Sequence, residues 1–99
     1  MYIVRNVFHC KPGQVRPLVE KFKALAPIME KMGARRPRIL TDVSGQPSWT
    51  MISEVEVENV SDYLEKAQTA LSGAEVRSIM EGYHDLVDNG RREILKLET

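Results

Sequence analysis

The sequence predicts a single α+β domain, residues 1–99, whose elements follow the order β-α-β-β-α-β. Two regions carry apolar residues at intervals of three and four, as amphipathic helices do. Four other segments are rich in β-branched and aromatic residues or alternate between apolar and polar ones, as strands do. No repeat, low-complexity tract or Ser/Gly linker divides the 99 residues, a length typical of one domain.

The first strand is expected at residues 2–10, before the turn signal Lys11-Pro12-Gly13. A helix follows, and Gly33 is expected to end it. Pro27 removes a hydrogen bond from the interior of this helix, so we expect a kink or a restart there. The apolar stripe of the helix consists of Val15, Leu18, Val19, Phe22, Leu25, Ala26, Met29 and Met32.

Residues 36–43 and 48–58 are expected to form an antiparallel hairpin around the polar turn 44–47. Residues 48–58 alternate between two faces of the strand. The more apolar face carries Trp49, Met51, Val55 and Val57, and the opposite face carries Thr50, Ile52, Glu54, Glu56 and Glu58.

A second helical region is expected after a cap at Asn59 or Ser61. Residues 72–75 fit a capping box, so we expect the helix to break and restart there. The restarted part carries an apolar stripe, and Asn89-Gly90 is expected to stop it before a last strand at residues 92–98. The stripe residues are Val76, Ile79, Met80, Tyr83 and Val87, and the last strand places Leu95 and Leu97 on one face.

This order is the split βαβ or ferredoxin-like arrangement, with both helices on one face of a four-stranded antiparallel sheet. The open face also receives apolar residues, because Ile52 and Ile94 lie opposite the more apolar faces of their own strands. Such a patch is large for a monomer, so we expect a homodimer through the open sheet face. The alternative is a monomer with a half-polar sheet face.

Charge and composition exclude several classes of protein. The chain has 14 Lys+Arg and 14 Asp+Glu, whereas nucleic-acid binding needs a basic surface, so we expect no nucleic-acid partner. Residues 1–6 lack the features of a signal peptide, and no apolar run approaches the ~20 residues of a membrane span. One cysteine forms no internal disulfide. We therefore expect a soluble, cytoplasmic protein with no membrane partner.

Three motifs carry a family resemblance over nearly the whole chain: residues 10–15 before an amphipathic helix, residues 42–45 before a strand that ends at 53–57, and residues 86–94. With them the chain resembles the dimeric α+β barrel superfamily, and within it the antibiotic-biosynthesis-monooxygenase-like and NIPSNAP-like groups. The resemblance implies a homodimeric α+β barrel with a small cavity between the sheet and helices of each protomer. Such proteins include cofactor-independent monooxygenases, heme-degrading enzymes and isomerases.

Asn6 is the first candidate catalytic residue, because a short amide is disfavoured in the middle of a strand. Its position is similar to that of an active-site asparagine in the heme-degrading members, where it could bind a substrate carbonyl or an oxygen species. The same resemblance adds Trp49 and His84 as catalytic candidates. The alternatives are an Asn6 side chain bonded to the backbone at a strand irregularity, and a surface His84 on a polar helix flank.

The candidate ligand-binding residues are Phe8, Tyr83, Glu54 and Arg38. Aromatic residues at this spacing line a pocket or simply fill the core. Glu54 and Glu56 are solvated if their strand extends past its partner, and they need cations if their face is buried. Those cations could come from Arg38, Arg92 or Lys96.

We expect no metal and no cofactor. His9 and Cys10 are adjacent in a strand and point to opposite faces, and the chain has no Cys-x-x-Cys, His-x-x-x-His or acidic cluster at ligand spacing. Cys10 is expected to be a small apolar filler. The resemblance implies a cofactor-independent monooxygenase or isomerase acting on a small aromatic or polyketide-like molecule. The lack of a clear base, nucleophile or metal set favours the alternative, a non-catalytic dimeric module for small-molecule binding or assembly.

Overall fold

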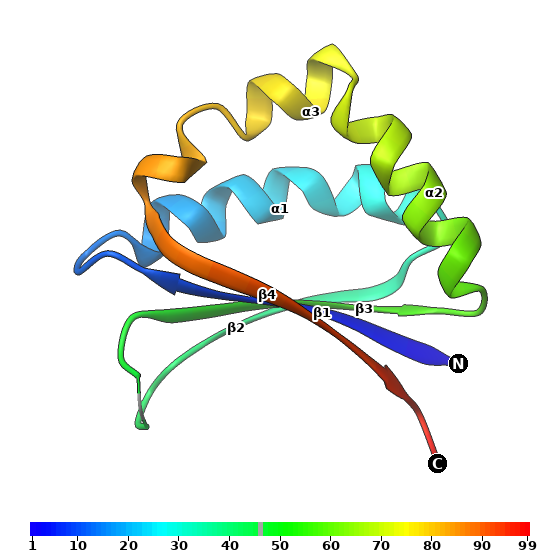
Figure 1. Ribbon diagram of the computed structural model, residues 1–99, viewed down its shortest axis with the longest axis horizontal. Coiled ribbons are helices and arrows are strands. Elements are labelled where there is room, and N and C mark those ends of the chain that lie inside the picture. The colour runs from blue at the N-terminus through cyan, green and yellow to red at the C-terminus, as the bar shows by residue number, and fades with distance from the viewer. Residues whose placement is uncertain (46) are drawn as a thin grey trace.

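The computed structural model describes residues 1–45 and 47–99, and its elements follow the predicted order (Figure 1). The strands are β1 (Tyr2–Cys10), β2 (Arg35–Thr41), β3 (Thr50–Val57) and β4 (Val87–Lys96). The helices are α1 (Val15–Lys31), α2 (Val60–Leu71), α3 (Ala74–Ile79) and the short 3₁₀ helix η1 (Tyr83–Asp85). Gln46 of the predicted turn lies outside the described residues.

The four strands form one antiparallel sheet in the order β2-β3-β1-β4. Helices α1, α2 and α3 lie on one side of this sheet, while its other side is bare (Figure 1). The predicted ferredoxin-like α+β fold is confirmed. We refer below to the helix-facing side and the open face of the sheet.

Helix α1 runs without a break through Pro27, so it does not restart there. Pro27 and Lys23 are both exposed, and the carbonyl that loses its helical hydrogen bond is therefore free to bind water. The opposite side of the helix buries Leu18, Val19, Phe22 and Leu25 against the sheet. Gly33 follows the end of the helix with a φ of 101°, a conformation in which glycine carries no Cβ penalty.

Asn59, rather than Ser61, caps α2: its side-chain Oδ1 accepts a hydrogen bond from the Asp62 amide at 2.9 Å. The predicted break after this helix is confirmed, but the predicted capping box is wrong. Gly73 occupies the cap position of α3 and provides no side-chain bond. Ser72 belongs instead to the end of α2, where its hydroxyl donates to the carbonyl of Thr69 at 2.7 Å.

The C-terminal part differs from the prediction, because Val87 begins β4 and does not continue a helix. Asn89 and Gly90, predicted to stop the helix, pair with His9 and Phe8 inside the sheet. The ring of Phe8 covers Gly90, and a Cβ at residue 90 would lie 3.0 Å from Phe8 Cδ1. A glycine is thus useful here because a neighbouring side chain approaches its backbone closely.

The register between β1 and its neighbours assigns residues to the two faces. Val7 pairs with Ile52 on the open face, where Ile52 was predicted to lie. Ile94 pairs with Val4 on the helix-facing side, so its predicted position on the open face is wrong. Leu95, which pairs with Ile3 of β1, lies on the open face in place of Ile94.

Two groups of buried side chains hold the helices on the sheet. The larger group joins α1 to one end of the sheet through Leu18, Phe22 and Met51. The smaller group surrounds Tyr63 of α2. Cys10 belongs to the larger group, and burial, with the nearby charges of Asp88 and Asp42, raises the pKa of its thiol. This is the environment of an apolar filler, as predicted for Cys10.

Candidate functional site

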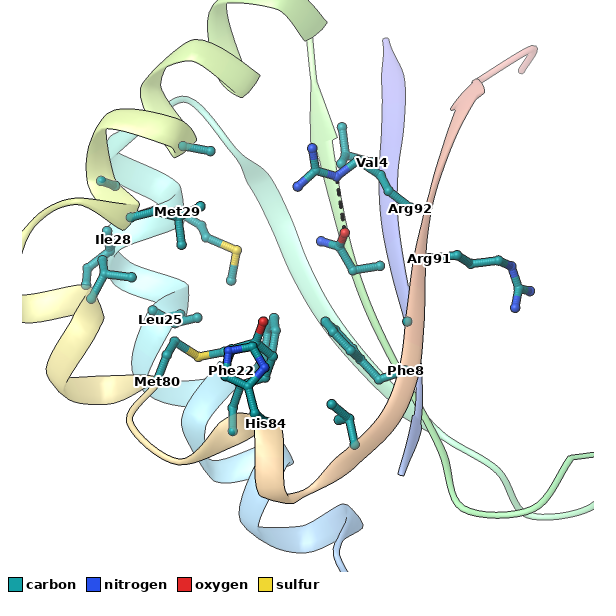
Figure 2. A pocket seen from close by; sticks show the side chains of 18 of the residues that line it. Val4, Phe8, Phe22, Leu25, Ile28, Met29, Met80, His84, Arg91 and Arg92 are labelled. Carbon is teal, nitrogen blue, oxygen red and sulfur yellow. Dashed lines mark hydrogen bonds between the residues drawn. The ribbon is translucent and has the colours of Figure 1, made fainter. Parts of the chain in front are cut away.

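A cavity of about 710 Å³ separates the helix layer from the helix-facing side of β1 and β4 (Figure 2). Its walls are mainly apolar and come from α1, α2 and the segment after α3; they include Phe22, Leu25, Met29, Ala67, Ala70 and Met80. Polar groups reach it from β1, β4 and η1. An apolar chamber with a few polar groups is typical of a small-molecule site.

Four of the residues singled out in the sequence line this cavity together: Asn6, Phe8, Tyr83 and His84. They come from two segments far apart in the chain, since β1 supplies the first two and η1 the others. Trp49, Glu54 and Arg38 do not line it. The last two lie on the open face of the sheet, where their strands pair Arg38 with Glu54.

Asn6 lies in the middle of β1, between Ser53 of β3 and Arg92 of β4. Its side-chain Oδ1 accepts a hydrogen bond from Arg92 Nε at 3.2 Å (Figure 2). The partner of the amide is therefore a side chain rather than the backbone. The register irregularity of β1 lies elsewhere, between His9 and Cys10.

Arg92 is a cavity residue that the sequence pattern did not reveal. It follows Asn89-Gly90, which were predicted to stop a helix, so the face of Arg92 could not be assigned from the sequence. Tyr63 of α2 lies within its electrostatic influence: burial raises the pKa of the Tyr63 phenol, and the positive charge of Arg92 opposes that rise. Arg92, Asn6 and Tyr63 thus form the polar end of the cavity.

Tyr83 and His84 lie side by side in η1, with ring centroids 4.1 Å apart and planes inclined by 36°. His84 is exposed at the edge of the cavity, and Tyr83 is half-buried. The 3₁₀ turn, rather than the predicted helix flank, carries the histidine. Gly82 makes this turn possible with a φ of 81°.

Trp49 lies just before β3, and its backbone adopts a φ of 62°, which is uncommon for a bulky residue. Its carbonyl accepts a hydrogen bond from the Cys10 amide at 2.8 Å, and this bond extends the pairing of the strands. The side chain is exposed. The backbone of Trp49 therefore pairs with β1 at the end of the sheet, and its side chain does not line the cavity.

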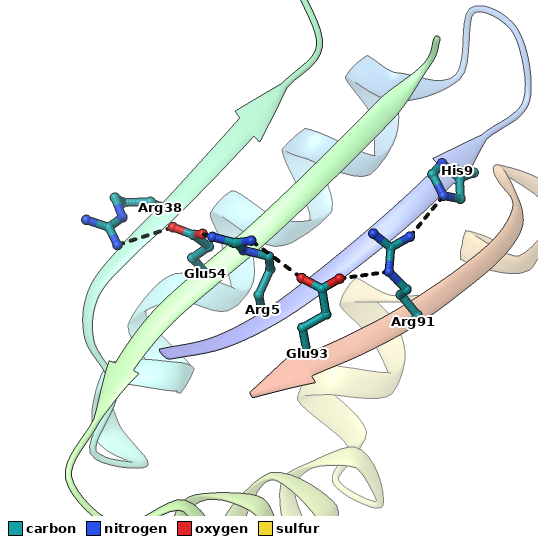
Figure 3. A network of polar contacts seen from close by, with 6 residues as sticks. All are labelled: Arg5, His9, Arg38, Glu54, Arg91 and Glu93. Carbon is teal, nitrogen blue, oxygen red and sulfur yellow. Dashed lines mark hydrogen bonds and ion pairs between the residues drawn. The ribbon is translucent and has the colours of Figure 1, made fainter. Parts of the chain in front are cut away.

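A row of alternating charges crosses the open face of the sheet from β2 to β4 (Figure 3). Arg38 contacts Glu54 at 3.2 Å, and Arg5 Nε donates to the same carboxylate at 2.6 Å. Arg5 also reaches Glu93 at 3.4 Å. Glu54 is only 7% exposed, so its two arginines offset the cost of removing its charge from water.

Arg38 was the correct sequence-based choice as a partner of Glu54, whereas Arg5 was missed. Arg92 and Lys96 cannot reach this carboxylate, because their register opposite Asn6 and Tyr2 turns them to the helix-facing side. Beyond Glu93 the row continues through Arg91, which donates to His9 Nε2 at 3.3 Å. We call Arg38, Glu54, Arg5 and Glu93 the charged row.

The charged row predicts a pH-dependent contribution to stability from Glu93. The hydrogen bond from Arg91, with further help from Arg5, lowers the pKa of this carboxyl below its ordinary value of 4.5. The stabilisation is therefore complete above pH 4.5 and is lost as the pH falls through the lower, folded-state pKa. Glu93→Gln is expected to reduce the free energy of unfolding at pH 6, and denaturant titration should show this difference shrinking towards pH 3. A pH-independent difference would contradict the prediction, and Glu98→Gln near the exposed C-terminus is the control.

Within residues 1–45 and 47–99, no group of three or more His, Cys, Asp or Glu side chains is arranged to hold a metal ion. Over the same residues, none of the helices combines the length and apolarity needed to cross a membrane.

Comparison with known proteins gives the fold but no sequence family. No family model matches the chain, and no curated protein matches it. Among solved structures, an uncharacterised NIPSNAP domain protein from Burkholderia xenovorans is similar with a TM-score of 0.80 and 10% identity, over 100% of this chain and 96% of that one. A NIPSNAP family protein of unknown function from Agrobacterium tumefaciens has a TM-score of 0.81 and 13% identity, over 98% and 87% of the two chains.

A candidate antibiotic biosynthesis monooxygenase from Nitrosomonas europaea is similar over the whole of both chains, with a TM-score of 0.74 and 13% identity. At these identities the likeness shows a shared fold. The chain therefore has the ferredoxin-like fold common to NIPSNAP-domain and antibiotic-biosynthesis-monooxygenase-like proteins, as the resemblance of its motifs predicted.

Proposed function

We propose that the protein is a homodimeric enzyme of the cofactor-independent monooxygenase type, which acts on a small aromatic or polyketide-like molecule. The observation that carries this proposal is the cavity, whose volume of about 710 Å³ lies within the ~300–1,000 Å³ of typical small-molecule sites. The monooxygenase-like neighbours of the same fold support the reaction class.

The cavity suits a flat apolar ligand that carries a few oxygen atoms. Phe8 and Phe22 form a tilted pair, with ring centroids 5.3 Å apart, which offers an aromatic surface. The methionines of α1 and of the segment after α3 add soft, adaptable walls. Asn6 faces this space and is the group that would orient a substrate oxygen, while His84 at the rim can take up or release a proton.

The proposed reaction needs only the substrate and molecular oxygen. A phenol with an unsubstituted ring carbon forms a new C–O bond to one atom of O₂ and loses two hydrogen atoms, giving a quinone. The second oxygen atom leaves as water. The substrate supplies all four electrons that O₂ accepts, so neither a metal nor a flavin is required for the balance.

The open face supports the dimer. Leu40, Ile52 and Val7 form an apolar row next to the charged row, and Leu95 and Ile3 lie on its other side. Leu40 is 43% exposed and Leu95 is 41% exposed in one chain. A second copy would bury the exposed Leu40 and Leu95, and it would cover the arginines that flank Glu54, in an arrangement of sheets packed face to face.

Ala67→Trp tests the use of the cavity. Ala67 of α2 lines the cavity, and the adjacent Gln68 is exposed, so Gln68→Trp is a matched control. The wild-type protein and Gln68→Trp are expected to consume O₂ with polyhydroxylated aromatic substrates, in an oxygen electrode without added metal or flavin. Ala67→Trp is expected to lose at least tenfold of that rate, because the indole occupies the space of the substrate.

Three outcomes would replace the proposal. Conversion of the substrate under argon at the same rate would indicate an isomerase. Ligand-induced thermal stabilisation that Ala67→Trp abolishes, without any turnover, would indicate a non-catalytic binding module. Equal behaviour of Ala67→Trp and Gln68→Trp in every assay would show that the cavity is not the site.

A further inference from the structure

Among the described residues, two arginines of the sheet strands form no ion pair, Arg36 of β2 and Arg92 of β4, and of these only Arg92 lines the cavity. Arg5, Arg35, Arg38 and Arg91 each form an ion pair with a glutamate. Among the described residues, Arg92 forms none within 4.0 Å, and its one side-chain hydrogen bond goes to the neutral Asn6. The exposed guanidinium of Arg92 therefore brings a positive charge to one end of a mainly apolar cavity, and no carboxylate of the described residues pairs with it.

The contact with Arg92 also fixes the orientation of the Asn6 amide. A guanidinium group only donates hydrogen bonds, so the atom of Asn6 that faces Nε must be the oxygen. The amide nitrogen then points elsewhere, and no hydrogen bond is made by it among the described residues. Both side chains thus offer donors, Nδ2 of Asn6 and the terminal nitrogens of Arg92, at the same end of the cavity.

The other charged and titratable groups leave this pair of donors uncompensated. Asp88, the acidic residue of the lining, lies four residues along β4, which is roughly 13 Å at ~3.3 Å per residue. Tyr63 contributes a neutral phenol, and His84 belongs to η1, beyond the Phe8 end of the sheet. Ser53, the neighbour of Asn6 on β3, is uncharged.

We propose that the cavity selects an organic anion, with the negative oxygen of a carboxylate or an ionised phenol bound between Arg92 and the Asn6 amide, and with the apolar body of the ligand among the phenylalanines and methionines. The inference rests on the proposed small-molecule function and names the class of ligand. A charge-assisted bond from a guanidinium to an anionic oxygen is stronger than a neutral one, particularly beside apolar walls. Arg92 is therefore a specificity-determining residue.

The test compares two ligands that differ only in charge, 2-naphthoate and 2-naphthamide, by isothermal titration calorimetry at pH 7.5. The wild-type protein is expected to bind the acid at least tenfold more tightly than the amide. Arg92→Gln is expected to remove that preference: the affinity for 2-naphthoate should fall about tenfold or more, and the affinity for 2-naphthamide should change little. Asn6→Asp, which places a carboxylate beside Arg92, is expected to have the same effect. Lys96→Gln is the control, because Lys96 lies on the same side of β4 but does not line the cavity.

The possible failures are distinct. If the wild-type protein binds the two ligands equally well and Ala67→Trp abolishes the binding of both, the anion selectivity is overturned. The proposed use of the cavity as a binding site is then still supported. Equal weakening of both ligands by Arg92→Gln would show that Arg92 only shapes the cavity. Failure of both ligands to bind the wild-type protein would overturn the selectivity and the proposed function together.

Discussion

Replacing Ile52 with aspartate is expected to convert the protein from a dimer into single subunits. Ile52 lies in the apolar row of the open face, between Leu40 of β2 and Val7 of β1. In the proposed dimer a carboxylate there would be buried in the apolar row, two residues along β3 from the carboxylate of Glu54 on the same face, which costs several kcal/mol or forces its neutralisation. Light scattering coupled to size exclusion should give the mass of two chains for the wild-type protein and of one chain for Ile52→Asp.

Ile94→Asp is the matched control for this experiment. Ile94 is 45% exposed, but it lies on the helix-facing side of β4 and does not line the cavity. Its replacement should leave the mass of two chains unchanged. A wild-type protein with the mass of one chain at working concentration would contradict the dimer, and so would an unchanged mass for Ile52→Asp.

The second large effect, a loss of stability, is expected in the larger group of buried side chains between α1 and the sheet. Met51 is 0% exposed and packs in the group that contains Leu18 and Phe22. Met51→Ala removes these contacts and leaves a cavity, so the free energy of unfolding should fall by about 2–5 kcal/mol. Since small domains have about 5–15 kcal/mol in total, chemical denaturation should detect the change clearly.

Met80→Ala makes the same chemical change at the wall of the ligand cavity. Met80 is only half-buried and packs at the edge of the larger buried group, with part of its side chain lining the cavity, so its truncation is expected to cost under about 1 kcal/mol. Similar losses in the two variants would contradict the view that the larger buried group stabilises the fold while the cavity stays available for a ligand. The binding of 2-naphthoate should show the reverse order, with Met80→Ala affected more than a folded Met51→Ala.

The first strand, α1 and the strand around residues 50–57 could be predicted because their patterns have one clear period. Apolar residues of α1 recur at helical spacing, and those of β3 alternate, so the sequence also assigned Ile52 and Glu54 to the open face. The C-terminal segment lacks such a period. Asn89-Gly90 has the composition of a stop signal, yet pairing with β1 and cover from Phe8 make it part of a strand.

The cavity was predicted in part. The unusual amide at Asn6 and the family resemblance pointed to β1, and the structure places Phe8, Tyr83 and His84 around the same space. Arg92 could not be assigned, because its side of the sheet depends on where β4 begins and on its register with β1. Arg5 was missed as the partner of Glu54 for a different reason: their contact joins residues 49 positions apart and depends on the register between β1 and β3.

The charged row constrains how two copies can stack. Its signs alternate from β2 to β4 as plus, minus, plus, minus, at Arg38, Glu54, Arg5 and Glu93. A symmetry axis parallel to the strands, between Glu54 and Arg5, would lay each charge over an opposite one, whereas an axis along the row would superimpose identical charges. Electrostatic complementarity thus favours one relative orientation of the two copies, and a related subunit with a different order of signs would fit less well.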